Sequence, residues 1–278
     1  MIVSQCGVTY ARTPLGFMVL AAAVLSGCRS TPDSPPLEPL PMKQAIGLVN
    51  ANTSKADGTV RAIGNVDGSL TLPEGKRRGY SLDGTMFFLS PNYVRFDLKK
   101  LGERQFLFGS NNKQYWFFDR DSKDYVCGRH GDADAENMPI RADQIADALG
   151  LRRFAEQGGA DSAILAQQRV TDEYQVVRVR EADSMTGQML VKEFWLDRRP
   201  PRLVRRVVFR EADGTPQLES RLSNYKQVGP DGLLLPHEMV ANWPKKKAHM
   251  RFRVSKWSVM PEVGADGPQF AAPADCKP

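Results

Sequence analysis

The sequence predicts a mainly β protein with a few helices, and two series of strand-like segments are the basis for this prediction. From Tyr80 to Val126, runs of aromatic and β-branched residues alternate with Gly, Pro and Asn clusters, a pattern typical of successive antiparallel hairpins. A second series runs from Arg169 to Trp257, again with turn signals between its segments. Because no long linker separates the two series and neither could close a core alone, we expect one domain over residues 42–278.

The first 27 residues predict an export signal. Arg12 precedes an apolar run from Leu15 to Leu25, which is too short to span a bilayer comfortably and fits the apolar region of a signal peptide. The run ends in Leu25-Ser26-Gly27-Cys28. This tetrad resembles the lipobox of bacterial lipoproteins, whose cysteine is acylated and becomes the mature N-terminus, so Cys28 is the expected lipidation residue. The alternative is an ordinary export signal followed by a chance cysteine.

Residues 28–41 are rich in Pro and Ser, which predicts an extended, disordered tether. One acyl chain binds a membrane only marginally, so stable anchoring takes more than one chain, and the three-chain modification of bacterial lipoproteins meets this requirement. An Asp after the lipidated cysteine is the usual inner-membrane retention signal in enteric bacteria, but Arg29 occupies that position here. We therefore expect a lipid-anchored protein on the periplasmic face of the outer membrane.

Two of the four cysteines remain for a disulfide. Cys6 leaves with the signal and Cys28 carries the lipid, so Cys127 and Cys276 form an even number of cysteines in an oxidising compartment. We predict that they form a disulfide that ties the C-terminal tail to the end of the first strand series. The alternative is two separate thiols.

Two segments predict short helices. Met42–Ser54 carries apolar residues at roughly helical spacing, and Pro139–Leu151 has a proline near its start and Gly150 at its C-cap. Between them, the strand-like segment 58–72 places small residues such as Ala62 and Gly64 on one face. Such residues allow a helix to approach closely, or they mark a strongly curved strand.

The first strand series is apolar on both faces. Met86 and Phe88 point to one side of their strand, whereas Phe87 and Leu89 point to the other. An antiparallel sheet that covers a core on one side only would be polar on its second face. Two explanations remain open: a helix or second sheet covers each face, or one face is a dry concavity for an apolar ligand.

The formal net charge of +6 is modest and scattered among acidic residues. Its densest run, Lys245-Lys246-Lys247, lies between two strand-like segments and is most simply a solvated hairpin tip. Contact with anionic lipid headgroups is the alternative interpretation of this run. We do not expect a nucleic-acid partner for an exported protein.

The histidines do not form a recognisable metal or catalytic motif. His130 lies near Asp132, Asp134 and Glu136, but their spacing matches no Ca²⁺ loop, and the second His or Cys of a zinc site is missing. We expect a surface loop there. The sequence contains no Gly-x-Ser-x-Gly elbow and no phosphate-loop spacing, so we expect no cofactor and no enzymatic activity.

From about Lys43 to the C-terminus, the order of parts resembles the LolA/LolB group of bacterial lipoprotein carriers. The resemblance rests on the predicted helices and on three motifs: Ser90-Pro91-Asn92…Arg95, Trp195-Leu196-Asp197…Pro201, and Leu222-Ser223-Asn224-Tyr225…Leu235-Pro236. It implies an unclosed antiparallel β half-barrel, here of about 11 strands, with helices covering a hydrophobic concave face. The lipobox makes the chain more similar to the membrane-anchored receptor of this group than to its soluble carrier.

The resemblance also implies a ligand site and a membrane contact. The site is the concave face, where acyl chains are bound; the candidate lining residues are Phe87, Leu89, Phe96, Phe106, Phe108, Trp116, Phe118, Ile145 and Leu149. The sequence does not decide which strand face is concave. The receptor carries a leucine that projects toward the membrane, and Leu101 is the matching residue. The alternative is that Leu101 packs inward at a hairpin end.

The leading hypothesis is therefore a carrier or receptor that binds acyl chains of lipoproteins or lipids, with affinity that comes mainly from apolar area. Release would be governed by movement of the helix over Pro139–Leu151 or of neighbouring loops. The alternative hypothesis is a sensory or scaffolding lipoprotein of the envelope that binds a protein partner through the same fold.

Overall fold

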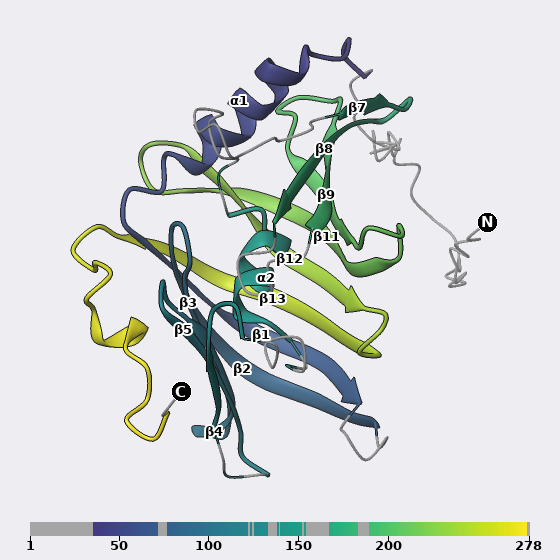
Figure 1. The fold of residues 1–278 in the computed structure, drawn as a ribbon. Coiled ribbons are helices and arrows are strands. Elements are labelled where there is room, and N and C mark those ends of the chain that lie inside the picture. The colour runs from purple at the N-terminus through teal and green to yellow at the C-terminus, as the bar shows by residue number, and fades with distance from the viewer. Residues whose placement is uncertain are drawn as a thin grey trace, which may run out of the picture. The chain divides into compact units, whose positions relative to one another are not determined.

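One antiparallel sheet of 13 strands dominates the computed structural model of the protein (Figure 1). The structure describes residues 36–71, 77–121, 123, 125–132, 138, 140–151, 153, 167–182 and 189–276, which belong to one compact unit. The strands are β1 (Thr59–Thr71), β2 (Arg77–Leu89), β3 (Tyr93–Lys100), β4 (Glu103–Ser110), β5 (Gln114–Asp119), β6 (Tyr125–Arg129), β7 (Gln167–Val170), β8 (Tyr174–Ala182), β9 (Met189–Asp197), β10 (Val204–Arg210), β11 (Pro216–Val228), β12 (Leu233–Trp243) and β13 (Ala248–Met260). The helices are α1 (Met42–Thr53), α2 (Ala142–Ala148) and the 3₁₀ turn η2 (Pro268–Phe270).

The strand order is β6-β5-β4-β3-β2-β1-β13-β12-β11-β10-β9-β8-β7. The two predicted series are therefore two meanders, β1–β6 and β7–β13, and they become one sheet because β1 pairs with β13. The predicted count of about 11 strands is too low. One reason is β7, a strand of four residues that carries no alternating apolar pattern and so gives no sequence signal.

The sheet is open and strongly bent. Among the described strands, β6 and β7 form its two edges and do not pair with each other. α2 contacts β3 and β4 on one side and β10 and β11 on the other. In a flat sheet β4 and β10, seven places apart, would lie about 34 Å from each other. A helix of seven residues is only about 10 Å long, so the sheet must curve around it. Figure 1 shows α2 within this bend.

The curvature has a local cause where β1 pairs with β13. The register between β1 and β13 shifts between Ile63 and Gly64, which is a β-bulge, and bulges bend a strand and increase its twist. A Cβ atom at Gly64 would lie 2.0 Å from the carbonyl oxygen of Arg253. Only glycine therefore fits at this close approach of β1 to β13.

Each face of the first meander is covered by a different part of the chain. The inner face carries Phe88, Phe96 and Phe108, which are buried in the main core together with residues of α2. On the outer face, Leu107 and Trp116 form a second buried cluster with Cys276 of the C-terminal segment. The covering element on that face is thus the C-terminal tail, rather than a helix or a second sheet.

A disulfide fixes this tail to the sheet. The structure joins Cys127 on β6 to Cys276, with their Cα atoms 5.7 Å apart and 149 positions apart in the sequence. Arg95 and Asn111 add hydrogen bonds from the sheet to the backbone carbonyls of Gln269 and Phe270, and Phe270 itself is buried.

α1 is attached to the second meander by both apolar and polar contacts. Its buried residues are Ala45, Val49 and Thr53, and the helix contacts β8 and β12. The Asn52 side chain both donates to the backbone carbonyl of Leu234 and accepts from its N–H, each at 2.9 Å. This side chain thereby pairs with the start of β12 as a neighbouring strand would.

The N-terminal predictions lie partly outside the described residues. The export signal, Cys28 and the first part of the tether belong to residues 1–35, which the structure does not describe. Residues 36–41 were predicted to be part of a disordered tether, but they are bound to the domain: Leu37 exchanges hydrogen bonds of 2.9 Å with Arg198, and Leu40 exchanges two with Gln175. No helix in the described part of the chain is long and apolar enough to cross a bilayer.

Candidate functional site

Two pockets lie side by side at the end of the sheet where β1 and β12 begin and where β2 and β11 end. We call this end the α1 end, because the C-terminal half of α1 forms part of both pockets. Pocket A has a volume of about 240 Å³ and pocket B a volume of about 320 Å³. Thr53 and Leu235 line both, so the two pockets share a wall.

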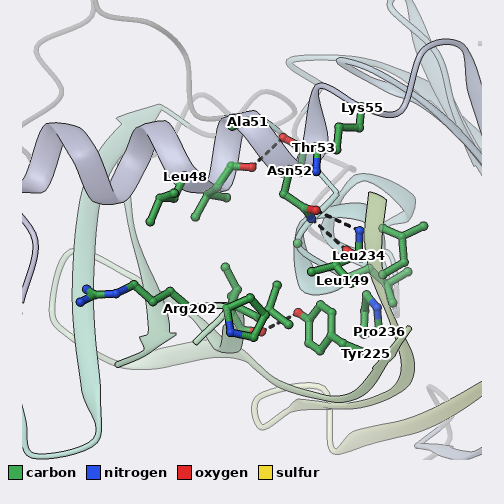
Figure 2. A pocket seen from close by; sticks show the side chains of 16 residues that line it. Leu48, Ala51, Asn52, Thr53, Lys55, Leu149, Arg202, Tyr225, Leu234 and Pro236 are labelled. Carbon is green, nitrogen blue, oxygen red and sulfur yellow. Dashed lines mark hydrogen bonds between the residues drawn. The ribbon is translucent and has the colours of Figure 1, made fainter. Parts of the chain in front are cut away.

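Pocket A lies between α1 and the segments that carry Leu203 and Tyr225 (Figure 2). Two of its polar side chains, Asn52 and Tyr225, already have hydrogen-bond partners. Asn52 binds the backbone of Leu234, and the Tyr225 hydroxyl donates a hydrogen bond of 2.5 Å to the carbonyl of Val204. Burial raises the pKa of Tyr225, although nearby Arg205 opposes the shift, so the hydroxyl keeps the proton that it donates. The apolar side chains that line the pocket include Leu48, Leu149 and Leu203.

Pocket B lies between the end of α1, the start of β1 and the end of β2. Val60, Phe88 and Leu89 form one side, and Leu233 and Leu151 form another. Leu149, immediately after α2, lines pocket A, whereas Leu151 lines pocket B. The C-terminal end of α2 therefore contributes to both pockets, and a movement of α2 would change both.

α2 is held to the second meander by polar contacts. Asp147 forms an ion pair with Lys192 of β9, with 2.7 Å between Oδ2 and Nζ, and both side chains are buried. The Ser220 hydroxyl of β11 donates to the carbonyl of Ala148 at 2.6 Å. These contacts fix the C-terminal turn of the helix.

A second pair of contacts holds the start of α2. Gln144 donates to Gln217 of β11 at 2.9 Å, and its carbonyl oxygen accepts from the Trp243 indole of β12 at 3.1 Å. On its other side, α2 contacts β3 and β4, whose inward-facing residues include Phe96 and Phe108. In the described residues, α2 is thus attached to the second meander by polar contacts and packs against an apolar surface of the first meander.

Six of the nine predicted lining residues lie on the inner face or at a pocket. Phe96 and Ile145 are fully buried in the main core, Leu89 lines pocket B, and Leu149 lines pocket A. Phe106 and Phe108 are also in this core and line a cavity of about 30 Å³.

Phe87, Trp116 and Phe118 were wrongly expected to belong to the same surface, because they point to the outer face. The strand period of two decides this: Phe88 and Phe117 point inward, so their neighbours point outward. Arg61 lies 5.5 Å from the centroid of the Phe87 ring, and Trp116 and Phe118 belong to the cluster under the C-terminal tail.

Several lining residues of the pockets were not anticipated. Leu48 and Asn52 come from α1, Leu203 precedes β10, and Leu235 lies near the start of β12. The exposed position of Leu48 on an amphipathic helix and the Leu233-Leu234-Leu235-Pro236 run are the sequence signals that could have pointed to them.

Leu101 lies at the opposite end of the sheet from the pockets. It is at the tip of the β3–β4 turn with φ of 52°, it is 93% exposed, and the exposed Lys99 and Lys100 precede it. The inward-packed alternative therefore does not occur. An exposed leucine beside two lysines suits a contact with anionic headgroups, which remains a prediction.

The described histidines have ordinary hydrogen-bond partners. His130 Nε2 lies 2.5 Å from the carbonyl of Asn111, and His237 Nδ1 lies 2.8 Å from that of Val254. Asp134 and Glu136 lie outside the described residues. Within the described residues, no cluster of three or more His, Cys, Asp or Glu is placed to hold a metal.

The bent open sheet, the buried short helix and the pockets at one end define a protein with an unclosed antiparallel β half-barrel. Solved structures share this architecture. A LolA-superfamily protein from Nitrosomonas europaea superposes with a TM-score of 0.50 at 10% identity, covering 77% of this chain and 93% of the other. A DUF1329 family protein from Desulfovibrio piger gives a TM-score of 0.50 at 12% identity, covering 81% and 95%.

A putative outer membrane lipoprotein-sorting protein domain from Vibrio parahaemolyticus is similar at a TM-score of 0.49 and 12% identity, covering 81% of this chain and 95% of that one. No family model and no curated protein matches the sequence. At these identities the likeness concerns the fold. The chain shares its fold with a LolA-superfamily protein, as the resemblance based on the order of its sequence motifs implies.

Proposed function

We propose that this chain is a lipid-anchored periplasmic protein that binds acyl chains of lipoproteins or lipids in its half-barrel and takes part in lipoprotein sorting at the outer membrane. The observation that carries the proposal is the apolar inner face, bent around α2, with two pockets at one end that both include leucine side chains. The proposed role is binding, driven by about 25 cal/mol for each Å² of apolar surface removed from water.

In this proposal α1 and α2 are the movable cover of the concave face. Pockets that hold small ligands usually measure about 300–1,000 Å³, so volumes of 240 and 320 Å³ are small for several acyl chains. Binding a lipoprotein therefore requires α2 to move. Because its polar contacts go to β9, β11 and β12, we expect α2 to separate from β3 and β4 while it stays attached to the second meander.

The proposed membrane contacts lie at opposite ends of the sheet. Pro36 follows Cys28 by eight positions, so this part of the tether reaches at most about 28 Å, and it joins the domain at the α1 end, where residues 36–41 are bound. Leu101 lies at the far end, and β3 is about 27 Å long. Both contacts can reach one membrane if the strands run roughly along its surface.

The acyl-binding proposal is tested by titrating the purified mature protein with a fluorescent acyl probe and an acylated peptide. We expect saturable binding to both. Ala51→Trp would place an indole in pocket A from an exposed position of α1 and should weaken binding, whereas Lys43→Trp on the same helix, away from the pocket, should not. Absence of saturable uptake would remove the proposal.

The membrane contact is tested separately with vesicles that contain anionic lipid. Leu101→Asp should reduce co-sedimentation of the protein with these vesicles, because it puts a negative charge beside the headgroups. Val126→Asp, at another exposed apolar position, is the control. Equal sedimentation of the two variants and the unchanged protein would contradict a role for Leu101.

A further inference from the structure

The charged residues around pockets A and B are mostly cations. Lys55 and Arg202 line pocket A, and Arg153 lines pocket B. Among the described lining residues, Asp57 in pocket B is the only carboxylate. Figure 2 shows Lys55 and Arg202 on opposite sides of pocket A, with the apolar side chains between them. Pockets that combine leucine side chains with cations match a ligand that has an apolar body and an anionic head.

These cations keep unused donors. Lys55 donates to the carbonyl of Gly232 at 3.2 Å, Arg153 to that of Ser54 at 3.5 Å, and Arg202 to that of Glu38 at 2.5 Å. Within the described part of the chain, none of the three forms an ion pair with a carboxylate. Lysine has three donors and arginine five, so each retains donors for a ligand.

Other cations of the chain behave differently. Arg104 is paired with Asp97, Arg205 with Asp197, and Lys192 with Asp147. Carboxylates are thus available as partners in the fold, but the described structure places none of them against Lys55 or Arg153. Both of these cations lie at the C-terminal end of α1, since Arg153 binds Ser54, the residue before Lys55.

We infer that the pockets bind a single-chain anionic amphiphile, specifically a long-chain fatty acid, with its carboxylate between Lys55 and Arg153 and its alkyl chain against the apolar walls. This inference rests on the proposed acyl-binding function and names its ligand. Volumes of about 240 and 320 Å³ suit one chain better than several. A carboxylate at the mouth stays in contact with water, so it avoids the large cost of burying a charge.

Asp57 provides a second test, in which the expected change in binding is the opposite of that for Lys55 and Arg153. A carboxylate near the mouth repels an anionic head, so its removal should strengthen binding, whereas removal of Lys55 and Arg153 should weaken it. A role of Arg153 in capping α1 alone would change stability but not the preference between charged and neutral ligands. Both effects should shrink as the salt concentration rises, because the groups are exposed.

The experiment measures binding of palmitate and of the matched neutral monopalmitin to the purified mature protein at low and high salt. At low salt, palmitate should bind roughly tenfold more tightly than monopalmitin, as expected for a few exposed charge pairs. Lys55→Gln with Arg153→Gln should abolish this preference, whereas Lys113→Gln with Lys226→Gln, the same charge change at other exposed sites, should not. Asp57→Asn should increase the preference for palmitate over monopalmitin, whereas Asp266→Asn, the control at another exposed position, should leave it unchanged.

The outcomes separate the two proposals. Equal binding of palmitate and monopalmitin would overturn the inference and leave the acyl-binding function standing. No saturable binding of either ligand would overturn both. Tighter binding of palmitoyl lysophosphatidic acid than of palmitate would overturn the assignment to a carboxylate. Unfolding midpoints of all variants, measured alongside, show that each protein is folded when its binding is compared.

Discussion

Asp147 and Lys192 provide the sharpest test of how α2 is held. Their side chains are only 3% and 8% exposed, and the ion pair joins α2 to β9. Asp147→Ala would leave the Lys192 ammonium buried without this partner. Removing one member of a buried pair typically costs about 3–5 kcal/mol, which is a large part of the roughly 5–15 kcal/mol that stabilises a domain.

The replacement of both residues distinguishes the pair from simple packing. Asp147→Ala combined with Lys192→Met removes both charges, and apolar replacement of a buried pair is often neutral, so we expect the double variant to recover most of the loss. Arg253→Gln is the control, because its pair with Asp67 is exposed and worth about 0–1 kcal/mol.

The assay is equilibrium unfolding in urea, with the free energy of unfolding compared among the four proteins. An Asp147→Ala effect as small as that of Arg253→Gln would refute the reasoning, as would a double variant that is less stable than the single one. The same variants test whether α2 moves during binding. The Asp147→Ala protein should take up an acyl probe faster than the unchanged protein, because α2 is then less firmly attached.

Three further predictions concern other parts of the fold. Burial raises the pKa of Asp97, but the hydrogen bonds and charge of Arg104, with neighbouring cations, outweigh it and hold the pKa below its ordinary value of 3.8. The stability that Asp97 contributes is therefore present above that value and lost as the pH falls below it through the lower folded value, so Asp97→Asn should flatten the fall in unfolding midpoint between about pH 5 and about pH 2. Cys276→Ser should cost about 2–5 kcal/mol of unfolding free energy, and an unchanged value would show that the tail holds without its bond to Cys127. Gly64→Ala should cost about 1–3 kcal/mol, because its Cβ meets a carbonyl of β13; a loss under half of that would mean that the bulge yields easily.

The order of elements could be predicted from the sequence, because strand composition, turn residues and helix caps are local signals. The two meanders and both helices lie where those signals are. The pairing of β1 with β13 could not be predicted from them, because it joins residues about 190 positions apart that carry no signal for each other.

The orientation of the first meander was also beyond the sequence. Phe87 and Phe88 are equally apolar, and an alternating pattern assigns an inner face only when the other face is polar. The C-terminal tail covers Trp116, so an aromatic residue on the outer face is as buried as one on the inner face.

The pockets depend on contacts between distant segments. Asn52 meets Leu234 across 182 positions, and this contact holds the C-terminal end of α1 against the start of β12. Likewise, Arg153 meets Ser54, the residue before Lys55, across 99 positions. Their chemistry is readable in the sequence, but their meeting is not.

Photo-crosslinking tests the central claim most directly. The purified mature protein is irradiated with a palmitate analogue that carries a photoreactive group on its chain, and the labelled residues are mapped by mass spectrometry. The acyl-binding account predicts labels on Leu149, Leu203 and Leu235, suppressed by excess unlabelled palmitate. Labels confined to the outer face around Trp116 and Phe118, or labels that palmitate does not suppress, would contradict it.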